Sequence, residues 1–298
     1  MTTKHPYHVV DVFTERALEG NALAVFPDAS KIDPAKMQKI ARELNLSETS
    51  FVATATRPDC AASVRIFTPA RELPFAGHPT IGTAFVLLEV GLVPANSERF
   101  VLEEKVGPVP VRVERGAGGR PLIWLLTPPI AEGRTYERDV CARALGLGVE
   151  DLLEIAPQHL SAGNPTIFVA VKDQAAVDRA SLDLAGMKAI HGPDRVTACV
   201  FVFAPVAHGA YSRMFAPEYG IVEDPATGSS TGPLAAYMMR HGLAPGSSGA
   251  RWHSEQGTHM GRRSILHVQS HGVEGKDGIE VGGYVSPFAE GVMTLDAD

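Results

Sequence analysis

Two short stretches of this sequence share one pattern: "PFAGHPTIG" at residues 74–82 and "VEDPATGSS" at residues 222–230. Each contains a polar residue, a proline, two further residues and a glycine. The polar residue is the base His78 before Pro79 in the first copy and the carboxylate Asp224 before Pro225 in the second. The repetition raises the question of whether the whole chain was built from two copies of one unit.

Four further pairs of stretches match in the same order along the chain, at separations of 143 to 150 residues. The matched stretches are Gly20-Asn21 with Gly163-Asn164, "IDPAKMQKI" with "LDLAGMKAI", Phe51-Val52 with Phe201-Val202, and "RIFTP" with "RMFAP". Five pairs in register indicate an internal duplication. We therefore predict an α+β fold of two pseudo-symmetric halves, residues 1–130 and 131–298, which face each other across a cleft.

Each half has the sequence pattern of a mixed β-sheet or barrel around a central helix. In the first half, strands are expected at "SFVATA" and "SVRIFTP", and a helix begins after Asp33 and Pro34, which suit its N-cap and first turn. The stretch "TIGTAFVLLEVG" is apolar on most faces of a helix, as expected for a helix enclosed by strands. "TGPLAAYMMRHG" is its counterpart in the second half.

The two repeated motifs precede these central helices, so we expect His78 and Asp224 to be N-cap residues. A helix N-terminus presents free amide groups to a carboxylate or phosphate. Gly77 in one copy and Gly228, Ser229 and Ser230 in the other leave room for such a ligand. The alternative is that both motifs only cap their helices. Pro233 would interrupt a helix that began at Ala226, so the second helix is expected to begin nearer Ser230.

Glu48, in "LNLSETSFV", is an acid without a counterpart, because the repeat places Ala198 opposite it. A glutamate in an apolar cleft has a raised pKa and can both accept and donate a proton. The alternatives are a solvated glutamate in a turn and a local capping arrangement with Asn45.

Composition excludes several classes of protein. The net charge is −7 and the basic residues are scattered, which argues against nucleic acid as a partner. No apolar run is long enough to cross a membrane and no signal peptide is apparent. Three isolated cysteines indicate a reducing compartment, so the cytoplasm is expected. We expect no metal site, because the cysteines and histidines lack the spacing of metal ligands.

The stretches "DVFTERALEGNALAVF", "LNLSETSFV", "RIFTPARELPFAGHPTIGTA", "EDPATGSSTG" and "EQGTHMGR" resemble the phenazine-biosynthesis PhzF-like isomerase family over nearly the whole chain. The resemblance implies a fold similar to that of diaminopimelate epimerase, a homodimer, and an isomerase without a cofactor whose substrate is a small carboxylate. It implies that Glu48 is the acid and base, and that His78, Asp224 and Ser229 line the substrate. Departures are Pro233 and "GRRS" at residues 261–264, where the family has Gly-Arg-Pro-Ser.

Three functions fit these observations. The first is an isomerase in which Glu48 moves a proton between two carbons of one ring. The second is an amino-acid epimerase or racemase, which needs two groups on opposite faces of the substrate; neither motif has a cysteine, so His78 and Asp224 would form the pair. The third is a non-catalytic protein that binds a small ligand.

Overall fold

The computed structural model describes residues 2–116, 119–191 and 198–296, which form two compact units. The first unit comprises Met1–Leu126 together with Gly282–Asp298, and the second comprises Thr127–Val281. The division differs from the predicted halves at the C-terminus. The last strand, β18 (Val285–Asp296), pairs with the first, β1 (Thr2–Val12), so the C-terminal segment belongs to the first unit.

The first unit contains a mixed sheet, with both parallel and antiparallel strand pairs. Its other strands are β2 (Asn21–Phe26), β3 (Glu48–Ala53), β4 (Ala62–Phe67), β5 (Glu72–Leu73), β6 (Arg99–Glu104), β7 (Gly107–Arg115) and β8 (Pro121–Leu126). Strands β2 and β3 are parallel, as are β4 and β6, and the pairs β1–β2, β3–β4, β4–β5, β6–β7 and β7–β8 are antiparallel. Strand β7 is followed in the chain by β8, and residues 117–118 between them lie outside the described part.

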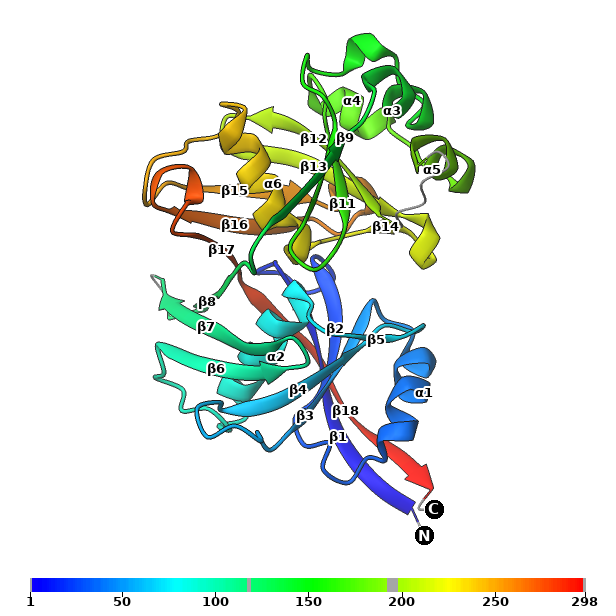
Figure 1. Ribbon diagram of the computed structural model, residues 1–298. Helices are drawn as coiled ribbons and strands as arrows, with labels where there is room; N and C mark the ends of the chain where they lie inside the picture. Colours follow the sequence, from blue (N-terminus) through cyan, green and yellow to red (C-terminus); the bar gives the residue numbers. More distant parts are fainter. Residues whose placement is uncertain (1, 117–118, 192–197, 297–298) are drawn as a thin grey trace. The chain divides into compact units, whose positions relative to one another are not determined.

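A buried helix, α2 (Gly77–Glu89), lies among the strands of the first unit (Figure 1). Every residue from Gly77 to Leu88 is buried, which confirms the prediction drawn from its apolar faces. The helix contacts β1, β2, β3, β8 and β18. Contact with strands on several sides explains why this helix has no polar face.

A second helix of this unit, α1 (Pro34–Leu44), packs its single apolar face on the sheet. Its first turn is closed by the carboxylate of Asp33, which accepts a hydrogen bond from the amide of Ala35 at 2.8 Å, as predicted. Met37 and Ile40 are buried against a cluster that contains Phe26, Phe51 and Phe67. The helix ends at Asn45, whose left-handed conformation (φ 51°) allows the chain to turn into β3.

The second unit repeats the order of strand pairings found in the first. Its strands are β9 (Ala131–Thr135), β10 (Gln158–Ser161), β11 (Thr166–Ala170), β12 (Cys199–Val206), β13 (Gly209–Ala216), β14 (Ile221–Asp224), β15 (Arg251–Gln256), β16 (Ser264–His271) and β17 (Gly278–Gly283, whose last two residues belong to the first unit). The pair β11–β12 is parallel, β12–β13 and β13–β14 are antiparallel, β13–β15 is parallel, and β15–β16 is antiparallel. This is the order of β2–β3, β3–β4, β4–β5, β4–β6 and β6–β7.

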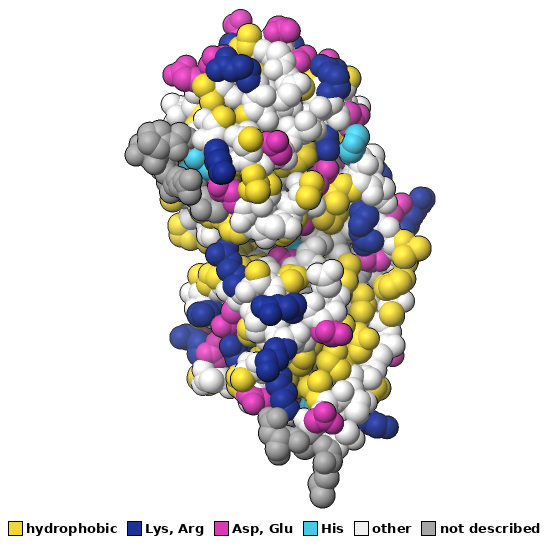
Figure 2. All heavy atoms as spheres, turned by 90° about the vertical axis from the view of Figure 1, so that its right-hand side faces the viewer, with side chains coloured by type: hydrophobic (Ala, Val, Ile, Leu, Met, Phe, Trp, Pro, Cys, Tyr) yellow, Lys and Arg dark blue, Asp and Glu magenta, His cyan; other side chains and the backbone are white. Residues whose placement is uncertain are grey.

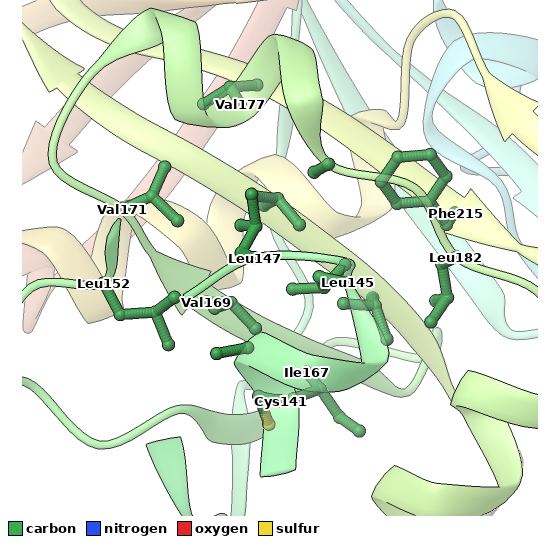
Figure 3. Packing of buried hydrophobic residues seen from close by; sticks show 14 of the residues in the cluster. Cys141, Leu145, Leu147, Leu152, Ile167, Val169, Val171, Val177, Leu182 and Phe215 are labelled. Atoms are coloured by element: carbon green, nitrogen blue, oxygen red, sulfur yellow. The ribbon is translucent and has the colours of Figure 1, made fainter. Parts of the chain in front are cut away.

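Helices cover both faces of the second unit's sheet. The long helix is α6 (Gly228–Arg240), and the shorter ones are α3 (Arg138–Ala144), α4 (Gln174–Arg179) and α5 (Leu184–His191). Short 3₁₀ turns lie at Val149–Asp151, Pro217–Tyr219, Thr258–Met260 and Val273–Gly275. Along β12, residues alternate between the two faces, so that Phe201 and Phe203 pack with α6 while Val200 and Val202 pack with the shorter helices. Figure 3 shows the cluster on the side of the shorter helices, which contains Ile167 and Val169 of β11 together with Leu145, Val177 and Leu182.

The surface shows no segregation of charge on the face drawn in Figure 2, where Lys and Arg side chains are mixed with Asp and Glu. Among the described residues, no helix combines the length and apolar character required to cross a membrane.

Candidate active site

Glu48 is the first residue of β3, four residues after Leu44, the last residue of α1. Its side chain is 13% exposed. It is therefore not a solvated turn residue, and Asn45 ends α1 through its own amide, which donates to the carbonyl of Ala41. Because β3 is parallel to β2 and contacts α2, the start of the strand is held beside the central helix of the unit.

His78 lies in the first turn of α2, where Gly77 is the first helical residue and Ala76 the N-cap. The prediction that His78 itself caps this helix is wrong. The reason is that Ala76 has the extended conformation of an N-cap residue (φ −154°, ψ 138°), so the helix begins one residue before the histidine. As a helical residue, His78 is held by the backbone of α2, and its side chain is 6% exposed.

The structure brings Glu48 and His78 together. Nε2 of His78 lies 3.1 Å from Oε2 of Glu48. Burial lowers the pKa of His78 to about 3, and a hydrogen bond with the backbone of Ala22 acts in the opposite direction. The imidazole is therefore neutral at pH 7. Since Nε2 faces Glu48 without a hydrogen bond of its own, we assign the bond with Ala22 to Nδ1.

This assignment decides where the lone pair of the ring points. A neutral imidazole has one N–H and one lone pair, and the N–H is used at Nδ1. The lone pair of Nε2 is then directed to Glu48. Such a nitrogen accepts a hydrogen bond from a protonated carboxyl group and has nothing to donate to an ionised one. The pair is thus suited to a glutamate that holds a proton during part of a reaction.

The second motif lies at the junction of β14 and α6. Asp224 is the last residue of β14, and Thr227, not Asp224, is the N-cap of α6. The helix begins at Gly228 and not near Ser230 as expected, so Pro233 lies inside it. The proline lacks the amide that would bond to the carbonyl of Ser229, which costs the helix one hydrogen bond near its start.

Asp224 is buried (7% exposed) within a network of polar groups. The hydroxyl of Thr227 donates to its carboxylate at 2.5 Å, and the amide nitrogen of the Gln256 side chain donates to its carbonyl oxygen at 2.7 Å. The Gln256 side chain also accepts from the backbone amide of Thr227 at 3.1 Å. These bonds fix the turn between β14 and α6.

The serines of this motif differ in what they already bind. Ser230 is fully buried; its amide donates to the carbonyl of Thr227 at 3.1 Å, and its hydroxyl lies 2.8 Å from that of Thr166. Ser229 is half-buried, and its hydroxyl oxygen accepts a hydrogen bond from the side-chain amide of Asn164 at 3.4 Å. Of the two, Ser229 is the better placed to contact a ligand. The amides of Gly228 and Ser229 are the first of the helix and have no carbonyl within it to bond to.

Sequence reasoning missed the polar side chains that support both motifs. Gln256 and Glu104 lie on the buried faces of β15 and β6, where alternating residues point to the core. A polar residue on an otherwise apolar strand face is the signal that could have found them. Within the part of the chain that the structure describes, no group of three or more His, Cys, Asp or Glu side chains is arranged to hold a metal ion.

Comparison with known proteins places this geometry in context. The family model described as phenazine biosynthesis-like protein matches residues 10–291. A trans-2,3-dihydro-3-hydroxyanthranilate isomerase of Pseudomonas aeruginosa is 37% identical over 299 residues, which cover 96% of this chain and 98% of the relative.

Two solved structures have the same architecture. A phenazine biosynthesis protein of the PhzF family from Bacillus anthracis superposes with a TM-score of 0.86 at 23% identity, covering 98% of this chain and 99% of its own. A predicted epimerase from Pseudomonas aeruginosa gives a TM-score of 0.80 at 34% identity, covering 97% and 99% of the two chains.

Proposed function

Since the chain belongs to the phenazine biosynthesis-like protein family, we propose that it moves a proton between two carbons of a small cyclic carboxylate, without a cofactor and with Glu48 as acid and base. Curated relatives at 36–37% identity over nearly the full chain are named isomerases, so the chain is an isomerase. The substrate named for these relatives, trans-2,3-dihydro-3-hydroxyanthranilate, has a carboxylate on a six-membered ring, which supports the substrate class.

The observation that carries the proposal is the 3.1 Å approach of Glu48 to the neutral His78. In the reaction, a C–H bond of the substrate breaks, its electron pair enters the conjugated system of the ring, and the proton forms an O–H bond on Glu48. That O–H bond then breaks as a C–H bond forms at another ring carbon. Glu48 and the sum of atoms are unchanged at the end.

His78 would stabilise Glu48 in the middle of this sequence. Its Nε2 lone pair accepts a hydrogen bond from the protonated carboxyl, the form that exists between the two transfers. An imidazolium at this position would instead stabilise the carboxylate and oppose proton uptake. Burial, which keeps the ring neutral, therefore serves the reaction.

The second unit carries, by itself, groups that suit a carboxylate ligand. A helix N-terminus with small residues attracts a carboxylate, and α6 presents the amides of Gly228 and Ser229 and the half-buried hydroxyl of Ser229. We include Gly77, at the start of α2, for the same reason. Ser230 we now assign to holding α6 in place, since its amide and hydroxyl have partners within the protein. The matching order of strand pairings in the two units supports their origin by duplication.

The test is proton exchange. We expect the protein in D₂O to place deuterium on one ring carbon of trans-2,3-dihydro-3-hydroxyanthranilate or a related cyclic carboxylate. Glu48→Gln should reduce turnover by about 10²- to 10⁴-fold, the usual contribution of general acid–base catalysis. Glu43→Gln, on the exposed side of α1, is the matched control and should leave the rate unchanged.

Three other results of the exchange experiment would each contradict part of the proposal. Undiminished exchange in Glu48→Gln would show that another group transfers the proton. Exchange on both faces of one carbon would favour an epimerase. Binding of the carboxylate without exchange in the unchanged protein would favour a ligand-binding protein.

A further inference from the structure

A second buried acid of the first unit lies outside the pair just described. Glu104 is the last residue of β6 and is 4% exposed. Its Oε1 lies 2.5 Å from the hydroxyl oxygen of Thr80, on α2. Burial raises the pKa of Glu104 to about 8, and the bond with Thr80 acts in the opposite direction. At pH 7 the group is therefore predominantly a neutral carboxylic acid.

The hydrogen atoms available here favour the same protonation state. The hydroxyl oxygen of Thr80 also lies 2.7 Å from the carbonyl oxygen of Ala76. A hydroxyl group has one hydrogen, so it cannot donate fully to both that carbonyl and an ionised carboxylate. If Glu104 keeps its proton, it donates to Thr80, and Thr80 donates to Ala76. The result is a continuous chain of hydrogen bonds that ends at the N-cap of α2.

The turn between β6 and β7 adds two further contacts to the same segment. The amide of Val106 donates to the carbonyl of Pro74 at 2.9 Å. The ammonium group of Lys105 lies 3.4 Å from a carboxylate oxygen of Glu72. Together with Glu104, these residues hold the chain from the end of β5 to the first turn of α2, the segment that contains His78.

The charged neighbours of Glu104 are directed elsewhere. On β6 itself, Glu103 accepts from Thr56, and on the following turn Lys105 pairs with Glu72 of β5. The neighbouring strands present uncharged residues here: Gly107 of β7 lies opposite Glu104, and β4 pairs with β6 through Ala62 and Ser63. On α2 the nearest titratable residue in sequence is His78, which is neutral.

We propose that Glu104 is a positioning residue which, as a neutral acid, fixes the first turn of α2 through Thr80 and so holds His78 at its distance from Glu48. The proposal rests on the proposed function of the Glu48–His78 pair. Loss of the Glu104 proton would remove the donor to Thr80 and draw the Thr80 hydroxyl hydrogen toward Glu104. The carbonyl of Ala76 would then keep only the bond from the backbone amide of Thr80, at 3.2 Å. Activity should therefore fall reversibly as Glu104 ionises.

The first experiment compares two substitutions by their pH profiles, with trans-2,3-dihydro-3-hydroxyanthranilate as the probe. Glu104→Gln is uncharged and donates from its amide, so it should keep kcat within about threefold. The unchanged protein should lose activity above about pH 8, where Glu104 ionises, and Glu104→Gln should not. Glu104→Leu is also uncharged but has no donor, and kcat should fall by about tenfold or more with a smaller change in KM. An alkaline decline that persists in Glu104→Gln would overturn the proposal.

The second experiment does not depend on catalysis. Infrared difference spectra between pH 7 and pH 9 should show a protonated carboxyl that ionises in the unchanged protein and is absent from Glu104→Gln. The ring resonances of His78 should shift over the same pH range and in Thr80→Val, which cannot donate to Ala76, but not in Thr80→Ser. An ionised Glu104 at pH 7, or His78 resonances indifferent to these changes, would refute the role.

The two measurements also separate this proposal from the proposed function. If Glu48→Gln stays active, the reaction assigned to Glu48 is wrong, while the infrared and His78 signals still decide whether Glu104 positions the helix. If Glu104→Leu does not fold, the comparison of Glu104→Gln with Thr80→Val and Thr80→Ser remains decisive.

Discussion

At the scale of single residues, burial determines the protonation states of two titratable groups in the first unit. Two buried groups have pKa values displaced in opposite ways by the same cause: desolvation keeps His78 unprotonated and Glu104 protonated. Both are therefore uncharged at pH 7. His78 is a neutral base beside Glu48, and Glu104 is a neutral acid that contacts α2 through Thr80. Both provide hydrogen-bonding groups in this part of the unit without adding a buried charge.

The neutral state of His78 predicts how stability depends on pH. The pKa of His78 is lowered from 6.5 to about 3 on folding, so between these values the unfolded chain binds a proton that the folded chain does not. The free energy of unfolding should therefore rise with pH across this window, by at most about 1.4 kcal/mol per pH unit from this residue.

His78→Asn should remove that contribution and make the acid side of the stability profile shallower. Urea titrations at several values between pH 4 and pH 7 measure the slope. His259→Asn, at a half-exposed position, is the control and should keep the slope of the unchanged protein. Equal slopes for His78→Asn and the unchanged protein would show that the histidine is not buried in its neutral form.

At the scale of elements, the close packing of α2 limits which residues the helix accepts. A Cβ atom added at Gly82 would lie 2.6 Å from Cδ2 of Leu23 and 2.8 Å from Cγ2 of Val12, two residues with 0% exposure. The glycine at the end of the first motif is thus explained by contact between helix and strands. It needs no ligand.

We expect Gly82→Ala to destabilise the protein by about 1–3 kcal/mol, the usual cost of overpacking, although alanine is the better helix former. Thermal and urea denaturation would measure the loss. Gly246→Ala is the control, because the nearest atom to its added Cβ is 3.5 Å away, and its effect should stay within about 0.5 kcal/mol. A Gly82→Ala protein as stable as the control would mean that α2 can move away from β1 and β2.

The elements also show how far local pattern predicts structure. Asp33 caps α1 as expected, because capping depends on residues next to each other in sequence. The N-caps of α2 and α6 differ from the prediction of His78 and Asp224, which rests on the prolines that follow these two residues. In the structure Pro79 lies within the first turn of α2, and Pro225 precedes α6. Proline is compatible with both places, so the dipeptide alone does not define the boundary.

At the scale of the whole molecule, the first and last strands of the described chain pair with each other. Strand β18 pairs with β1 from Val285 opposite Val12 to Asp296 opposite Thr2, so the first unit contains both ends of the described chain. The second unit lies between Thr127 and Val281 in sequence. The homodimer expected from the family resemblance stays a prediction that sedimentation measurements would test.

Deletion of residues 285–298 should unfold or loosen the first unit, because β1 would lose the strand that pairs with it from Thr2 to Val12 and keep only β2, which pairs with its second half. Hydrogen exchange followed by mass spectrometry should show faster exchange in β1 and β2, with protection retained in β11–β13. Phe288→Ser, at a side chain 52% exposed, leaves the pairing intact and should exchange as the unchanged protein does. Unchanged protection of β1 after the deletion would contradict this assignment of the C-terminal strand.

The sequence by itself determined the identity of the main elements and of the candidate residues, because periodicity, capping and repeated motifs are local properties. It indicated the buried central helix, and it singled out Glu48, His78 and Asp224. Only the tertiary structure decided that Glu48 meets His78, that Glu104 supports Thr80, and that the last strand pairs with the first. These contacts join segments far apart in the chain, and their formation depends on how strands and helices pack, which no local pattern encodes.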